Sequence, residues 1–168
     1  MADDCDIKDL GRHGGFDHYG IYLIENISGY RPKRIAKIVR KEEYYITKKL
    51  QGHPNIVSMM PMSKVGKKKA CVVMEYCENG NLHNYLDKVE DKDKVIRDIT
   101  KAVGHMLSKG YVQTDLWRYR GEHLSNFFVR KYGDVVLGDF GGTEKITNKN
   151  LTELLKQMKI IIDYVNIY

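Results

Sequence analysis

The sequence lacks the long apolar stretches that would carry a chain across a membrane. Its longest uncharged apolar run is far shorter than the roughly 20 residues that a membrane-spanning helix needs. The N-terminal decapeptide MADDCDIKDL is acidic and has no apolar centre, so we expect no secretory signal. Internal repeats and low-complexity segments are absent as well. We therefore expect a cytoplasmic protein with no membrane partner.

Cysteine is scarce. The three cysteines, Cys5, Cys71 and Cys77, are odd in number, and their spacing is not that of metal ligands. Free thiols in a reducing compartment are the simplest interpretation of this pattern.

The composition is that of an ordinary globular protein, with 42% apolar and 30% charged residues in a chain of 168. This length suits one domain or two closely packed lobes. The net charge of +6 suits an anionic partner such as a nucleotide, but the lysines are scattered along the chain. The densest basic cluster, residues 64–70, is typical of a solvated hairpin turn, so we do not expect a nucleic-acid partner.

Strands dominate the first part of the chain. Residues 20–27 and 33–39 have the alternation and the β-branched content of two strands joined by a turn. Residues 40–52 are predicted to form a helix that stops at Gly52, and Pro54 forces a break after it. A buried strand is predicted at the start of residues 70–82, before a polar turn.

The rest of the chain favours helices and a late hairpin. Helices are predicted over residues 82–89, 94–109 and 151–165, the second ending at Gly110. A short strand from Tyr111 and a hairpin turning at residues 132–134 lie between them. The predicted class is therefore α+β, in two parts that divide after residue 76.

A cluster of glycines, LGRHGGF at residues 10–16, precedes the first of these strands. Glycines allow backbone N–H groups to approach a phosphate closely, although such clusters more often form turns.

Lys37 lies within the apolar strand, where a lysine is more often on the solvent face. The helix that follows changes this expectation, because Glu43, Ile46 and Leu50 share one face that should point inward. A desolvated carboxylate needs a partner, so we expect Glu43 to pair with Lys37 and to hold it for phosphate oxygens. Glu42 lies to one side of this face and is expected to be solvated.

Three polar residues lie in turns of the second half, Asp115 and Asn126 before a strand and Asp139 at the end of the hairpin. Asp115 could accept a proton from an attacking hydroxyl, and the oxygens of Asn126 and Asp139 could bind a hard cation such as Mg²⁺. Asp and Asn are also common turn residues in any loop.

These segments, in this order, resemble the eukaryotic-type protein kinase family. The resemblance extends from about residue 7 to residue 146 and rests on RIAKIV, the inward Glu43, LQGHPNIV, VVMEYCENGNL, Asp115 with Asn126, and VVLGDFG. It implies a bilobal fold, with a small β-rich N-lobe over residues 1–76 and a truncated helical C-lobe over residues 77–168.

The resemblance also implies a role for each matching residue. Asp115 would be the catalytic base, Lys37 the phosphate-binding lysine positioned by Glu43, and Asn126 and Asp139 the Mg²⁺ ligands. The other positions implied to contact ATP are the glycine-loop residues Gly11, Gly14, Gly15 and Phe16, the adenine-covering Ala36, the gatekeeper Met74, and the hinge residues Glu75 and Cys77.

The chain departs from the family at several points. The family's His-Arg before the catalytic aspartate is replaced by Gln113-Thr114, and extra residues within WRYRGEHL separate Asp115 from Asn126. After Gly141 there is no Ala-Pro-Glu motif, and little chain remains for a substrate-binding subdomain. Short kinases of bacterial effectors and viruses are similarly trimmed. We expect one helix, 151–165, under the catalytic loop, and no control by activation-loop phosphorylation.

Two functions from different classes follow. The first is a minimal ATP- and Mg²⁺-dependent protein kinase, with Ser/Thr specificity as our expectation, whose substrate could be a host protein. An activating partner or a dimer would complete its C-lobe. The second is a kinase-like decoy that binds a kinase or a regulatory protein and catalyses little. A small-molecule phosphotransferase would share the chemistry, but HPNIV and the hinge segment favour the protein-kinase branch.

Overall fold

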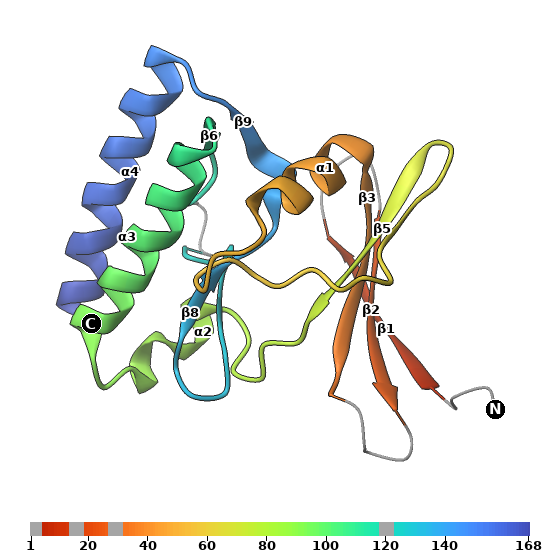
Figure 1. Ribbon diagram of the computed structural model, residues 1–168. Coiled ribbons are helices and arrows are strands. Elements are labelled where there is room, and N and C mark those ends of the chain that lie inside the picture. The colour runs from red at the N-terminus through yellow and green to blue at the C-terminus, as the bar shows by residue number, and fades with distance from the viewer. Residues whose placement is uncertain (1–4, 14–18, 27–31, 118–122) are drawn as a thin grey trace. The chain divides into compact units, whose positions relative to one another are not determined.

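The structure is a computed structural model, and it describes residues 5–13, 19–26, 32–117 and 123–168 (Figure 1). The chain forms two compact units. The first comprises Met1–Lys48 and Ser58–Tyr76, and the second Lys49–Val57 and Cys77–Tyr168. The chain thus leaves the first unit for the last time after residue 76, where we placed the domain boundary. The segment Lys49–Val57 belongs to the second unit.

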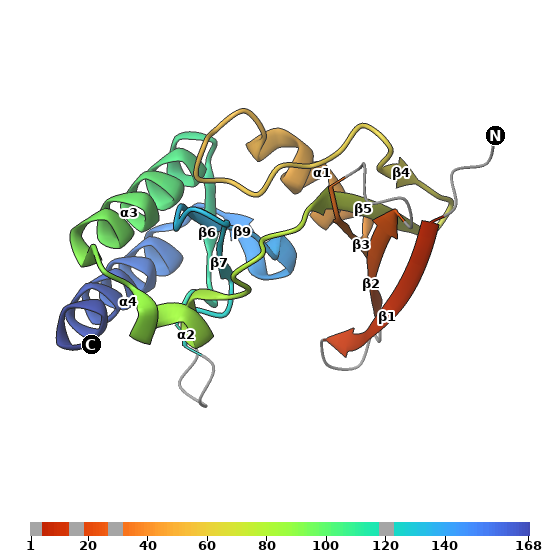
Figure 2. The same ribbon diagram turned by 90° about the horizontal axis from the view of Figure 1, so that it is seen from below.

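The first unit is built on a five-stranded antiparallel sheet with the strand order β1-β2-β3-β5-β4 (Figure 2). Its strands are β1 (Cys5–His13), β2 (Tyr19–Asn26), β3 (Arg34–Arg40), β4 (Lys64–Val65) and β5 (Lys69–Glu75). Both predicted strands of the first third are therefore confirmed, as is the strand that begins near residue 70. The lysine-rich cluster forms the exposed β4–β5 turn, as expected.

Helix α1 (Lys41–Leu50) follows β3 directly. Two glutamates in its first turn suit the positive end of the helix dipole, and Gly52 beyond its end has a φ of 91° that favours glycine. Tyr44 of α1 packs with Val39, Ala70 and Val72 in a buried cluster on the sheet. Glu42 is exposed, as predicted.

The inward face of α1 is broader than predicted. Tyr44, Thr47 and Leu50 are its buried residues, whereas Glu43 and Ile46 are half-buried. Tyr44 and Thr47 lie one position beyond the two residues that we chose, so the centre of the buried face is turned by one residue. Thr47 tolerates burial because its hydroxyl donates to the backbone oxygen of Glu43 at 2.7 Å.

The second unit contains three α-helices among its described residues, with short strands between them. Its elements are α2 (Leu82–Tyr85), the 3-10 turn η1 (Leu86–Lys88), α3 (Lys92–Ser108), β6 (Tyr111–Gln113), β7 (Phe127–Val129), β8 (Val135–Leu137), the 3-10 turn η2 (Phe140–Gly142), β9 (Thr143–Lys145) and α4 (Asn148–Ile167). Strands β7 and β8 form one hairpin, and β6 pairs with β9. Strand β9 was not predicted.

Helices α3 and α4 lie side by side in both views (Figures 1 and 2). Each begins at a side-chain cap. Asp91 accepts a hydrogen bond from the Lys94 amide, and Thr147 and Asn150 form a reciprocal capping box. Ile99 and Met106 of α3 and Ile161 of α4 are almost fully buried and form part of the core of this unit.

The segment Lys49–Val57 is fixed along β8. The Val57 amide donates to the Leu137 oxygen at 2.9 Å, and the Leu137 amide donates to the Asn55 oxygen at 2.9 Å. The buried Asn55 side chain also donates to the Val135 oxygen at 2.9 Å. A segment from the first third of the chain therefore acts as an edge strand of the β7–β8 hairpin.

The α+β class is confirmed, with a β-rich first unit and a mainly helical second unit. The 3-10 turn η2 is followed by β9 and α4. None of the helices formed by the described residues is both long and apolar enough to cross a membrane.

Candidate active site

Asp115 lies in the loop that follows β6, where three hydrogen bonds tie it to its neighbours. Its Oδ1 accepts one from Gln113 Nε2 at 2.7 Å and another from Asn126 Nδ2 at 3.1 Å. Asn126 Nδ2 also donates to the backbone oxygen of Asp115 at 3.1 Å. Asn126 is only 2% exposed. The two residues that we selected in this region are therefore in direct contact, although they are far apart in sequence.

Gln113 connects this pair to Asp139. It is fully buried at the end of β6, and its Nε2 donates to the Asp139 backbone oxygen at 2.9 Å as well as to Asp115. Its Oε1 accepts a hydrogen bond from the Thr143 hydroxyl. A buried amide needs partners for both of its ends, and here Gln113 binds Asp115 on one side and Asp139 and Thr143 on the other.

Gly142 closes the site from the η2–β9 side. Its oxygen accepts hydrogen bonds from the Thr114 amide at 3.2 Å and from the Thr114 hydroxyl at 2.9 Å. A Cβ at residue 142 would stand 2.7 Å from Oδ1 of Asp115, closer than real Cβ contacts allow. Only glycine leaves room for the carboxylate in this position.

Asp139 follows β8 and has a left-handed backbone, with φ 54° and ψ 72°. This conformation is unfavourable for a residue with a side chain and is held only where the surroundings impose it. The preceding Gly138 amide donates to the Asn126 oxygen at 2.9 Å, and Gln113 holds the Asp139 oxygen. A strained aspartate fixed on both sides is typical of a functional position.

Lys37 and Glu43 pair within the first unit, as predicted. Lys37 Nζ donates to Glu43 Oε1 at 2.9 Å, and the two side chains are 12% and 14% exposed. Little water reaches the pair, so the attraction is stronger than that of a surface ion pair. Ala36, next to Lys37 in β3, is buried at 8% exposure.

The predicted hinge residues lie at and beyond the end of β5. Met74 is half-buried and forms an isolated antiparallel β-bridge with Met59. Glu75 is paired with Ser58 twice, since its Oε1 accepts from the Ser58 amide at 2.7 Å and its own amide donates to the Ser58 oxygen. Cys77 is buried and is not in a disulfide, and its backbone oxygen accepts a hydrogen bond from the Gly80 amide.

Gly11 is the one described member of the predicted glycine loop; Gly14, Gly15 and Phe16 lie outside the described residues. Gly11 lies inside β1, at a shift in the β1–β2 register, and so precedes β2, the first of the predicted strands. Its φ of 97° requires glycine, and its amide donates to Asp9 Oδ1 at 2.8 Å.

The donor set suits a hard divalent cation. The amide nitrogen of Asn126 points to Asp115, which leaves the amide oxygen as its cation-binding atom, and Asp139 supplies a carboxylate. The described residues contain no cluster of three His, Cys, Asp or Glu side chains that would hold a metal by themselves. Amide and carboxylate oxygens are ligands of the type that Mg²⁺ takes, and Mg²⁺ needs few protein ligands when a nucleotide supplies others.

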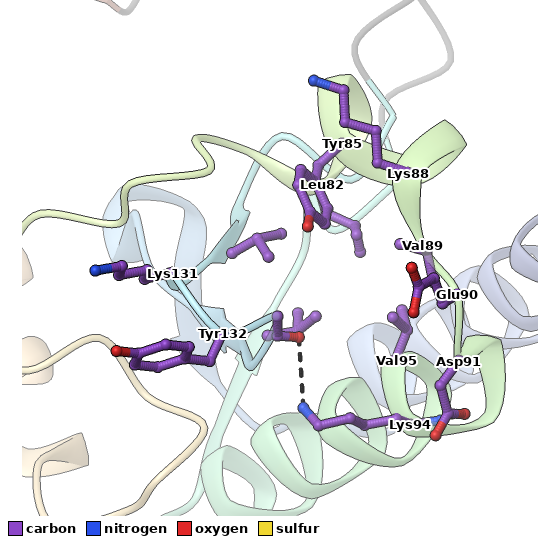
Figure 3. A pocket seen from close by; sticks show the side chains of 13 residues that line it. Leu82, Tyr85, Lys88, Val89, Glu90, Asp91, Lys94, Val95, Lys131 and Tyr132 are labelled. Atoms are coloured by element: carbon purple, nitrogen blue, oxygen red, sulfur yellow. Dashed lines mark hydrogen bonds between the residues drawn. The ribbon is translucent and has the colours of Figure 1, made fainter.

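A separate cavity of about 360 Å³ lies between the α2–α3 region and the β7–β8 turn (Figure 3). Apolar side chains such as Leu82 and Val95 line it together with charged ones such as Lys88 and Glu90. Lys94 at its edge donates to the Gly133 oxygen and pairs with Asp98 and Asp134. Asp115, Asn126 and Asp139 do not line this cavity.

Sequence reasoning missed Gln113, Gly142 and Thr143 as site residues. We treated Gln113 only as a missing histidine. A polar residue at an inward strand position, directly before the loop of Asp115, was the available signal. For Gly142 the signal was the glycine pair Gly141-Gly142, whose second member has no evident turn to form.

Comparisons with known proteins agree with this arrangement. The family model described as the protein kinase domain matches residues 24–165. A probable serine/threonine-protein kinase of Dictyostelium discoideum is 32% identical over 165 residues, which cover 84% of this chain and 14% of that protein. MAP kinase kinase kinase SSK2 of Saccharomyces cerevisiae is 28% identical over 151 residues, 86% of this chain and 9% of that protein. The chain thus spans a small part of the curated relatives it matches.

Among solved structures, the kinase PK-1 of Cydia pomonella granulovirus has a TM-score of 0.61 and 16% identity to this chain. The match covers 83% of this chain and 55% of that one, and it concerns the fold. The family model covers most of the chain, including the Lys37–Glu43 pair and the network around Asp115. The chain therefore belongs to the protein kinase family.

Proposed function

We propose that this protein is a minimal protein kinase that transfers the γ-phosphoryl group of ATP to a serine or threonine hydroxyl of a protein substrate. The observation that carries the proposal is the Gln113-centred network, which holds Asp115, Asn126 and the backbone of Asp139 together. Phosphoryl transfer depends mainly on positioning and on charge neutralisation, and a buried network of this kind serves both.

Each residue has a defined part in this proposal. Asp115 accepts the proton of the attacking hydroxyl, and Lys37, held by Glu43, binds phosphate oxygens. Asn126 and Asp139 hold Mg²⁺, which neutralises charge on the phosphates when bound. The glycine-loop residues Gly11, Gly14, Gly15 and Phe16 would cover the phosphates, and Ala36, Met74, Glu75 and Cys77 would line the adenine site.

We also propose a setting for this activity. Neither Cys71 nor Cys77 is in a disulfide, and burial raises the pKa of the Cys71 thiol, which makes it less reactive at neutral pH. Such cysteines suit a reducing cytoplasm, which would be that of a host cell if the protein is viral or a bacterial effector. The substrate would then be a host protein.

An activating partner or a second copy of the chain would complete the shortened helical unit. The support for this lies on α4, where Leu151, Leu155, Met158 and Ile162 form an apolar stripe along one face and are half-buried or exposed. Leu155 alone is 62% exposed. If the stripe is covered in an assembly, Leu155→Glu should shift the sedimentation coefficient toward that of a monomer.

The decisive experiment for catalysis is a labelled-ATP transfer assay with Mg²⁺, on generic protein substrates and on the protein itself. The wild type is expected to transfer label, and Asp115→Ala and Asp139→Ala are expected to lose nearly all of the activity. Glu42→Gln, an exposed change in α1, is the matched control and should leave it intact. Label on small metabolites instead of protein would indicate the small-molecule phosphotransferase.

A thermal-shift assay distinguishes the kinase from the remaining alternative, a kinase-like decoy. Stabilisation by Mg-ATP without any transfer would indicate a nucleotide-binding decoy. If wild type and variants transfer equally little label and Mg-ATP leaves the melting temperature unchanged, the kinase proposal is wrong.

A further inference from the structure

Gln157, in the middle of α4, is 3% exposed and reaches the loop that carries Asp115. Its Oε1 accepts a hydrogen bond from the Trp117 amide at 3.1 Å, and its Nε2 donates to the Thr114 oxygen at 3.0 Å. The same Nε2 lies 3.5 Å from Glu153 Oε1, one turn earlier in α4. One side chain thus satisfies a backbone acceptor before Asp115 and a backbone donor after it.

This double contact restrains the backbone around Asp115. Thr114 is further tied to Gly142, and the Leu116 side chain is buried at 1% exposure. With Thr114 and Trp117 both held by Gln157, the intervening Asp115 and Leu116 have little freedom to change their backbone angles. A buried backbone group that lost its partner would draw the loop toward water, because unpaired polar groups are costly inside a protein.

Tyr164 makes a second contact between α4 and the same loop. It lies two turns after Gln157, and its ring packs edge-on against Trp117 with centroids 5.0 Å apart. The His123 ring stacks on the Trp117 ring system, with centroids 4.1 Å apart and an interplanar angle of 6°. The centroids of His123 and Tyr164 are 5.5 Å apart. Trp117 and His123 both belong to the segment WRYRGEHL that holds the extra residues, so α4 contacts this segment through Tyr164.

Tyr164, the tyrosine that packs on Trp117, is uncharged at neutral pH. Burial, followed by the hydrogen bond with Tyr168, raises the pKa of Tyr164 to about 12. The phenol is therefore uncharged across the pH range of ordinary assays, and Trp117 remains 9% exposed beneath it.

We propose that Gln157 is a positioning residue, which fixes the carboxylate of Asp115 for proton transfer by bridging Thr114 and Trp117 from α4. The proposal deepens the kinase function given above and rests on it. In this chain α4 restrains the catalytic loop through one polar bridge and one aromatic contact. Gln157 acts through Asp115 and does not itself meet the reacting atoms.

The test uses the full chain and three variants. Gln157→Leu removes both hydrogen bonds at similar volume. Gln157→Glu keeps an acceptor for the Trp117 amide but loses the donor to Thr114 when ionised. Lys156→Gln changes the exposed neighbour in α4 and is the matched control. Melting temperatures confirm that each variant is folded at the assay temperature.

Two readouts are compared. The first is steady-state transfer, where Gln157→Leu is expected to lower kcat on the order of 10- to 100-fold and to leave the KM for ATP within about twofold, since a small displacement of a catalytic group acts on the chemical step. The second is acrylamide quenching of Trp117, the one tryptophan in the sequence, which should rise in Gln157→Leu. Gln157→Glu should fall between Gln157→Leu and wild type in both, and Lys156→Gln should match wild type.

A folded Gln157→Leu with wild-type kcat, or with unchanged quenching of Trp117, would overturn the proposal. A rise in the KM for ATP with no change in kcat would overturn it too, because Gln157 would then serve binding. If Gln157→Leu does not fold, the same comparisons are made with Gln157→Glu. If the wild type transfers no label, the kinase proposal fails, and quenching alone then decides whether Gln157 anchors the loop.

Discussion

Gly142 lies so close to Asp115 that a Cβ at this position would stand 2.7 Å from Oδ1 and 2.9 Å from Cγ of the carboxylate. The carboxylate has little room to retreat, since Gln113 and Asn126 both donate to Oδ1. The Asp115 carboxylate, our proposed base, therefore fits in this position because residue 142 has no Cβ.

Gly142→Ala is expected to displace the Asp115 carboxylate and to break at least one of its hydrogen bonds. Transfer activity should fall roughly 10- to 100-fold, because a displacement of this size matters strongly in catalysis. The free energy of unfolding should fall by about 1–2 kcal/mol for the lost bond. Kinetic assays and urea unfolding measure the two effects.

Gly104→Ala is the matched control for that substitution. Gly104 is exposed in α3, and a Cβ there would meet nothing within 4 Å. Because alanine favours the helix over glycine, this variant should gain about 0.5–1 kcal/mol in stability and keep full activity. Equal behaviour of the two variants would contradict the close contact at Gly142.

Gln113→Leu should destabilise the protein by about 2–6 kcal/mol, measured by urea unfolding. The change leaves the Asp139 oxygen and the Thr143 hydroxyl without their buried partner, and each such group costs about 1–3 kcal/mol. Gln51→Leu is a milder comparison, because Gln51 is half-buried and donates to the Val57 oxygen. A loss at residue 113 no larger than that at residue 51 would mean that the Gln113 network contributes little.

Glu43→Gln should reduce transfer activity about 10- to 100-fold, with much of the effect in the KM for ATP. The neutral amide no longer holds the Lys37 ammonium by charge, so the ammonium is less firmly positioned for phosphate oxygens. Glu42→Gln, one position earlier and exposed, should have no effect. Activity measured over a series of ATP concentrations separates the two, and equal losses would argue against the pair.

Acid should weaken the fold through His53. Burial, with the nearby His105 and Lys101, lowers the pKa of His53 below its ordinary 6.5, and its Nδ1 accepts a hydrogen bond from the Asn55 amide. The unfolded chain therefore takes up this proton first. Stability should be complete above about pH 6.5 and decline as the pH falls through the lower, folded pKa.

The check is the melting temperature between pH 8 and pH 5 for wild type and for His53→Gln. The histidine stacks on His105 at 4.5 Å, and a neutral glutamine cannot gain the charge that opposes folding. The melting temperature should therefore fall less steeply with decreasing pH in His53→Gln than in the wild type. A parallel decline in both proteins would assign the acid sensitivity to other groups.

Much of the fold could be predicted from local patterns. Helix α1 and the β7–β8 hairpin were predicted because periodicity, a stop at Gly52 and a turn at residues 132–134 are encoded within a few neighbouring residues. The Lys37–Glu43 pair was also predictable, since a charged residue on an inward helix face needs a partner nearby in space.

What could not be predicted depends on contacts between distant residues. Strand β9 has no strong pattern of its own and exists because it pairs with β6. Gln113 and Gln157 are ordinary polar residues in sequence, and their importance comes from the backbone groups that the fold brings to them. The register shift at Gly11 likewise depends on the pairing of β1 with β2.

The placement of Lys49–Val57 along β8 has a consequence for how the protein can be divided. A cut after Tyr76 would release a C-terminal fragment without its edge strand, and the backbone groups of β8 that bind Asn55 and Val57 would be bare. Such an open edge promotes pairing with other chains, so the fragment is expected to aggregate. During synthesis, residues 49–57 cannot pair with β8 until residue 137 has left the ribosome.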